Sequence, residues 1–65
     1  MSLSQKVAAA MLHEKSDRLA TAERDLRRAV RRGEHGASLE GKLQAVEVAQ
    51  SQRDGAAAEF RASTR

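Results

Sequence analysis

A single segment of this chain, Gly33 to Ser38, has the character of a turn, and it lies at the middle of the sequence. Its two glycines, three positions apart, favour a break between helices. Elsewhere the chain has no proline and one aromatic residue, and it is dominated by Ala, Leu, Glu, Arg, Lys and Gln, which favour helix. We therefore expect an all-α fold: a coiled-coil-like two-helix antiparallel hairpin with a helix at about 3–32, a turn at about 33–37 and a helix at about 38–63.

Short polar residues and a glycine mark the ends of the two predicted helices. Ser2, followed three residues later by Gln5, has the spacing of a capping box at the start of the first helix. Gly33 follows two arginines, and glycine accepts the left-handed conformation in which many helices end. Ser38 is predicted to cap the second helix through its hydroxyl group.

The first predicted helix carries a stripe of apolar residues with alternating spacings of four and three, which is typical of a seam between packed helices. The stripe contains Ala8, Leu12, Lys15, Leu19, Ala22, Leu26, Ala29 and Val30, all of which we expect to belong to the seam. Leu occupies one type of seam position and mostly Ala the other. Lys15 is the one polar interruption.

The second predicted helix repeats this pattern and also has a polar interruption at mid-length. Its predicted seam consists of Leu39, Leu43, Val46, Gln50, Arg53, Ala57 and Phe60. Folding the chain back at the turn places Lys15 near Asp54, so the two polar interruptions coincide. This coincidence favours a hairpin over one continuous helix, and we expect a half-buried Lys15–Asp54 pair to fix the register of the helices.

The apolar content is small for a chain that must fold alone. Of its 26 hydrophobic residues, 13 are alanine, and 65 residues allow one small domain, residues 1–65, with little buried surface. Additional alanines lie beside the predicted seam of the second helix, at Ala45, Ala49 and Ala56. We expect this flank to be a second contact surface, which packs against another copy to form a homodimeric four-helix bundle or against a helix of another protein.

A cluster of five arginines in nine residues is the most distinctive charged segment. Four of them, Arg24, Arg27, Arg28 and Arg31, lie opposite the seam of the first helix. A solvated face that complements the negative end of the helix explains such a cluster. A face that binds nucleic-acid phosphates or an acidic protein is the functional alternative.

Several classes of function are not expected from this sequence. There is no cysteine, so thiolate metal sites and disulfides are excluded, and this composition fits a cytoplasmic protein. His13 with Asp17, and Glu34 with His35, each offer two metal ligands without a third, so we expect no metal and no cofactor. No nucleophile motif or phosphate-binding loop occurs, and an enzyme is not expected. The longest apolar run, six residues from Val7, is too short for a membrane span.

The layout resembles two families of small helical hairpins. One is repressor of primer, an RNA modulator that dimerises into a four-helix bundle through Ala/Leu seams, which implies the same architecture here. The turn placement, with Leu26 before Arg32-Gly33 and then Leu39 and Leu43, is similar to that of the hairpin co-chaperones of type III secretion needle subunits.

From these patterns we predict a helical protein–protein interaction module without enzymatic activity, such as an adaptor, a small chaperone or a regulatory subunit. It would act through its Ala/Leu seams, as a homodimer or with a helical partner. The alternatives are a small RNA- or DNA-binding hairpin that uses the arginine face, and a hairpin of the needle co-chaperone type.

Overall fold

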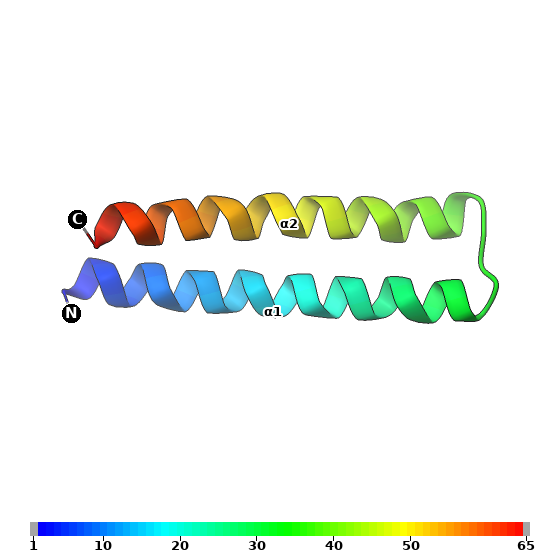
Figure 1. The fold of residues 1–65 in the computed structure, drawn as a ribbon, viewed down its shortest axis with the longest axis horizontal. Helices are drawn as coiled ribbons and strands as arrows, with labels where there is room; N and C mark the ends of the chain where they lie inside the picture. Colours follow the sequence, from blue (N-terminus) through cyan, green and yellow to red (C-terminus); the bar gives the residue numbers. More distant parts are fainter. Residues whose placement is uncertain (1, 65) are drawn as a thin grey trace.

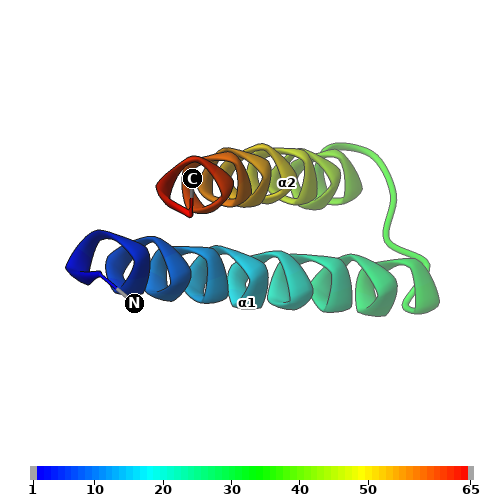
Figure 2. The same cartoon turned by 60° about the vertical axis from the view of Figure 1, so that its left-hand side comes forward.

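Two long helices, joined by a short turn, form the whole of the described structure. The computed structural model describes residues 2–64, with helix α1 at Leu3–Arg31 and helix α2 at Ala37–Ser63. The helices run antiparallel and side by side along their full length, and both chain ends lie at the end away from the turn (Figures 1 and 2). The expected all-α hairpin is therefore confirmed, and no strand occurs between residues 2 and 64.

A capping box begins α1, as the sequence predicted. The Gln5 backbone N–H donates to Ser2 Oγ at 3.2 Å, and the Ser2 backbone N–H donates to Gln5 Oε1 at 3.0 Å. These two bonds satisfy donors that have no partner within the helix.

The turn uses both glycines in the left-handed region, Gly33 with φ 76° and Gly36 with φ 67°. The Glu34 N–H donates to the Ala29 carbonyl and the Gly33 N–H to the Val30 carbonyl, each at 3.0 Å. This pair of bonds is a Schellman motif, in which glycine ends a helix without steric cost from a Cβ atom. The role expected for Gly33 is confirmed.

The predicted cap on α2 is wrong. Gly36 occupies the N-cap position and provides no side-chain cap, because α2 already begins at Ala37. Ser38 therefore lies inside the first helical turn, where its hydroxyl donates to Glu34 Oε1 at 2.5 Å. With Gly36 as N-cap, α2 begins two residues earlier than it would with Ser38 in that position.

Burial along α1 follows the stripe expected from the sequence, except at its end. Leu19 and Ala29 are buried, and five of the other six predicted seam residues are half-buried. Val30 is the exception, because its side chain is 59% exposed. It lies one position past the seam, since Ala29 completes the last seam position before the turn.

At every second position, the observed seam of α2 lies one residue before the predicted one. Its observed members are Leu39, Lys42, Val46, Ala49, Arg53, Ala56 and Phe60, all buried or half-buried, with Ala57 half-buried beside them. Leu43 and Gln50, which were predicted to belong to it, are exposed. Ala49 and Ala56, which were expected to form a free flank, are buried between the helices instead.

Complementary sizes across the interface explain this choice of phase. Leu19 lies twelve residues before the end of α1, and Ala49 lies twelve residues after the start of α2, so they face each other at one level of the hairpin. By the same reckoning Leu12 is level with Ala56, and Ala22 with Val46. A large side chain on one helix thus meets a small one on the other, which allows close approach along the hairpin.

Candidate interaction surface

The seam divides the hairpin into two long sides that differ in shape and charge. One side, which we call the hollowed face, carries three shallow hollows along its length. Its lining residues outside the seam include Ser4, Val7, Met11, Glu14, Arg18, Thr21 and Asp25 of α1, and Gly41, Ala45, Val48, Gln52 and Glu59 of α2.

Small side chains of α2 make the middle of the hollowed face concave. Gly41, Val48 and Gly55 recur every seven residues and therefore share one edge of the helix. A Cβ atom added at Gly41 or Gly55 would meet no atom within 4 Å. The backbone of α2 is consequently open to close approach by another helix along this edge.

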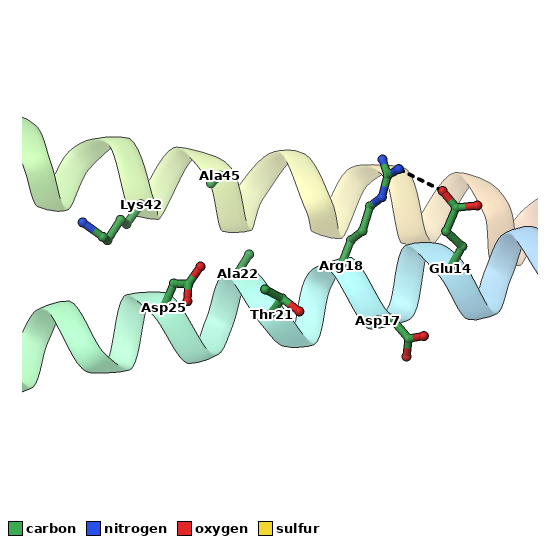
Figure 3. A pocket seen from close by; sticks show the side chains of 8 residues that line it. All are labelled: Glu14, Asp17, Arg18, Thr21, Ala22, Asp25, Lys42 and Ala45. Carbon is green, nitrogen blue, oxygen red and sulfur yellow. Dashed lines mark ion pairs between the residues drawn. The ribbon is translucent and has the colours of Figure 1, made fainter.

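An ion pair borders the central hollow. Glu14 Oε1 lies 2.9 Å from a terminal guanidinium nitrogen of Arg18, and both side chains are at least half exposed. Figure 3 shows the pair reaching from α1 toward α2, and further along the hollow Ala22 points from α1 toward α2, where Ala45 also lines the hollow. Asp17 points away from α2 (Figure 3). The hollow thus has an apolar floor and a charged rim, with the carboxylates of Glu14, Asp17 and Asp25 and the cations of Arg18 and Lys42.

Exposed apolar side chains extend the hollowed face toward the open end of the hairpin. Val7 is 55% exposed, Met11 is also exposed, and together they line the hollow at that end. Leu3, at 78%, is the most exposed of the large apolar residues there. On α2, Val48 adds a further exposed side chain on the same side of the molecule.

The opposite side, which we call the charged face, is richer in ionisable groups. The helical repeat places on it Lys6, His13, Glu23 and Arg27 of α1, and Glu40, Glu47, Asp54 and Arg61 of α2. Val30 and Leu43 are the large exposed apolar residues of this side. Leu43, which was predicted to be a seam residue, is therefore exposed to solvent on this face.

Two cations occupy the middle of the seam. Lys15 lies sixteen residues before the end of α1, and Arg53 lies sixteen residues after the start of α2, so both are at one level and both are half-buried. Arg53 Nε is 3.0 Å from Asp54 Oδ1, but its N–H is not aimed at an acceptor within residues 2–64. The expected Lys15–Asp54 ion pair is not formed, because Asp54 lies with its neighbour Arg53 instead.

Glu34 organises the turn end of the seam. Its carboxylate accepts hydrogen bonds from the Lys42 ammonium at 2.8 Å and from the Ser38 hydroxyl. These bonds, with the positive charges of Lys42 and Arg32, lower the pKa of Glu34 below its ordinary value of 4.5, against a smaller opposing effect of burial. Lys42 can occupy a seam position because its alkyl stem packs there while its ammonium reaches the turn.

The arginines expected to form a basic face lie on the outer side of α1. Arg24, Arg27, Arg28 and Arg31 are all exposed. Within the part of the chain that the structure describes, none of the four has a carboxylate within ion-pair distance. Their guanidinium groups are therefore accessible to an anionic partner.

The structure distributes the predicted interface residues over different surfaces. Most lie in the seam between α1 and α2, including Phe60, which is half-buried near the open end. Ala45 alone of the predicted alanine flank is exposed, on the hollowed face. Sequence reasoning missed Gly41, Val48 and Gly55, although their seven-residue spacing was a visible signal.

Among residues 2–64, no group of three or more His, Asp or Glu side chains is placed to hold a metal ion. Neither helix has an apolar stretch long enough to cross a membrane. Comparison with protein-family models, with curated proteins and with solved structures finds no significant match.

Proposed function

We propose that this protein is a non-enzymatic helical interaction module that acts as a homodimer, with the role of an adaptor, small chaperone or regulatory subunit. The observation that carries the proposal is the distribution of large apolar side chains. Leu19 alone among those of residues 2–64 is buried, whereas Leu3, Val7, Met11, Val30, Leu43 and Val48 are exposed. A second helical surface would remove part of this area from water and stabilise the hairpin.

The exposed area of the hairpin supports the same proposal. A compact monomer of 7.1 kDa exposes about 4100 Å², whereas this chain exposes 4795 Å². The hairpin is 47 Å long and only one helix thick in its shortest direction, at 11 Å between Cα extremes. Such a shape buries little of itself, and association is the usual source of stability for chains of this kind.

Mass and thermal unfolding in solution test this proposal. Sedimentation equilibrium should give twice the chain mass of 7.1 kDa, and the midpoint of thermal unfolding should rise with protein concentration, as mass action requires. A chain that stays monomeric and unfolds at a midpoint independent of concentration would contradict the proposal.

Nucleic-acid binding is the second candidate function, and the unpaired arginines favour it. Arg24, Arg27, Arg28 and Arg31 are exposed on one side of α1, without an ion-pair partner in residues 2–64. Guanidinium groups at helical spacing suit contact with successive phosphates. Because Arg24, Arg27 and Arg31 do not line the hollows of the hollowed face, this function is compatible with self-association.

Salt dependence tests the second candidate. Binding to a double-stranded RNA or DNA probe should weaken steeply with the logarithm of salt concentration, and Arg27→Ala with Arg31→Ala should weaken it further and reduce the slope. Lys6→Ala, which removes a cation from the other end of α1, is the control and should have a smaller effect. Affinity that responds to neither change would exclude this use of the arginines.

A further inference from the structure

We propose that the hollowed face binds the hollowed face of a second copy of this chain, in an antiparallel arrangement with the two turns at opposite ends. This inference rests on the proposed self-association and adds the surface, the orientation and the register. The two-fold axis passes level with Ser16 and Gln52, so that α1 packs on α1 of the second copy and α2 on α2.

Charge complementarity sets the register along α1. Glu14 and Arg18 are the central charged pair of the hollowed face and already lie 2.9 Å apart within one chain. An antiparallel two-fold axis midway between them brings each Glu14 to the Arg18 of the second copy. Reciprocal pairs of this kind fix register and orientation in helical assemblies.

Size complementarity supports the same axis along α2. Arg18 and Gln52 line one hollow, so they lie at nearly the same level. Antiparallel packing about Gln52 places Val48 within one residue of the level of Gly55 of the second copy, and Gly41 within one residue of the level of Ala62. Because space is open at both glycines, the two α2 helices can approach closely, with each valine against a glycine.

The opposite side is less suited to this contact. The charged face carries seven Lys, Arg, Asp or Glu side chains, excluding His13, whereas the hollowed face outside the seam carries six, which are Glu14, Asp17, Arg18, Asp25 and Glu59 of the lining and Arg28, seven residues after Thr21. More charged groups would lose water on the charged face. Covering about a quarter of the 4795 Å² on each copy would remove about 2400 Å² in total, within the range of stable homodimers.

Single cysteines at two nearby glutamines provide the test. The chain has no cysteine, so Gln52→Cys places one thiol per chain at the proposed axis, while Gln50→Cys places one on the charged face. Both glutamines are exposed positions of α2. Under mild oxidation Gln52→Cys should form a disulfide-linked dimer at least tenfold faster than Gln50→Cys, because a disulfide needs Cα atoms about 4.4–6.8 Å apart.

A charge exchange tests the register independently. Arg18→Glu should weaken dimerisation about tenfold or more, since it sets like charges against each other at two symmetric places. The double variant Glu14→Arg with Arg18→Glu restores both pairs and should recover the affinity. Failure of the double variant to recover would overturn the register.

The outcomes separate this inference from the proposed function. A monomeric unmodified chain would overturn both. A dimeric chain in which Gln50→Cys links faster, or in which neither cysteine links, would overturn the face and axis inferred here and leave self-association standing.

Discussion

The Lys42 ammonium lies 2.8 Å from Glu34 Oε1, and this bond connects the turn to the second helical turn of α2. The same oxygen accepts the Ser38 hydroxyl, and Arg32 Nη1 lies 3.8 Å from the other carboxylate oxygen. Since Gly36 gives α2 no side-chain cap, Glu34 adds its negative charge to that of Glu40 near the positive end of α2. The turn is thereby held to both helices by one carboxylate.

Glu34→Gln should make the stability of the hairpin less dependent on pH. The pKa of Glu34 is lowered in the folded chain, chiefly by the Lys42 hydrogen bond, so the unfolded chain binds more protons between that lowered value and 4.5. The contribution of Glu34 is therefore fully present above pH 4.5 and is lost as the pH falls through the lowered pKa. Thermal unfolding followed by circular dichroism from pH 2 to 7 should show a smaller loss in the variant.

Glu47→Gln is the matched control for this change. Glu47 is exposed on α2 and has no ion-pair partner within residues 2–64. Its pH profile should follow that of the unmodified chain. If Glu34→Gln and Glu47→Gln gave the same profile, the Glu34 carboxylate would have no special part in holding the turn.

Gly41→Ala and Gly33→Ala should change stability in opposite directions. Gly41 lies inside α2 and an added Cβ meets nothing within 4 Å in the single chain, so alanine should stabilise the monomeric hairpin by about 1 kcal/mol through helix propensity, while in the dimer the Cβ atom would oppose close approach of the second α2. Gly33 has φ 76°, where alanine costs about 1–2 kcal/mol. Urea unfolding at one fixed protein concentration measures both. A loss of stability in Gly41→Ala would mean that another surface occupies this space.

The fold could be predicted from this sequence, because composition, one turn segment and two caps all indicated the same hairpin. The seam of α1 could also be predicted from the sequence, since leucine and alanine alternate along it. The seam of α2 was not, because the prediction favoured the larger Leu43 over Lys42. Leu26 and Glu34 together explain the difference: the stem of Lys42 packs level with Leu26 while its ammonium reaches Glu34.

The surface was harder to predict for a related reason. Alanine is equally compatible with a buried seam and an exposed flank, so burial at Ala49 and Ala56 depends on which leucines of α1 they face. That information is in the register between helices and not in the local pattern. Ala45, four residues before Ala49, looks the same in sequence and yet is exposed.

Ala45→Glu and Ala49→Glu should therefore have different effects. Ala49 is 7% exposed and level with Leu19, so a glutamate there would place a charge between the helices and should destabilise the hairpin by more than about 3 kcal/mol. Ala45 is exposed on the hollowed face, so its variant should keep the helical content and weaken self-association. Circular dichroism and sedimentation distinguish the two results. Equal loss of helix in both would contradict the observed phase of α2.

Lys15→Met should raise the stability of the protein by about 1 kcal/mol. Lys15 is half-buried in the seam, level with Arg53, and no carboxylate lies within ion-pair distance of it in residues 2–64. Methionine would remove the repulsion between two cations and the partial desolvation of the ammonium, while filling a similar volume.

Lys6→Met is the matched control, because Lys6 is exposed on the same helix and its replacement should change stability by less than about 0.5 kcal/mol. Urea unfolding at one protein concentration gives the two free energies, and sedimentation shows whether assembly is unchanged. A Lys15→Met variant that gains stability and keeps its assembly state would show that Lys15 does not fix the register. A variant that loses stability or changes its assembly state would instead support the role in fixing register that was predicted for Lys15. The acidic partner of Lys15 would then belong to a second copy, in place of Asp54.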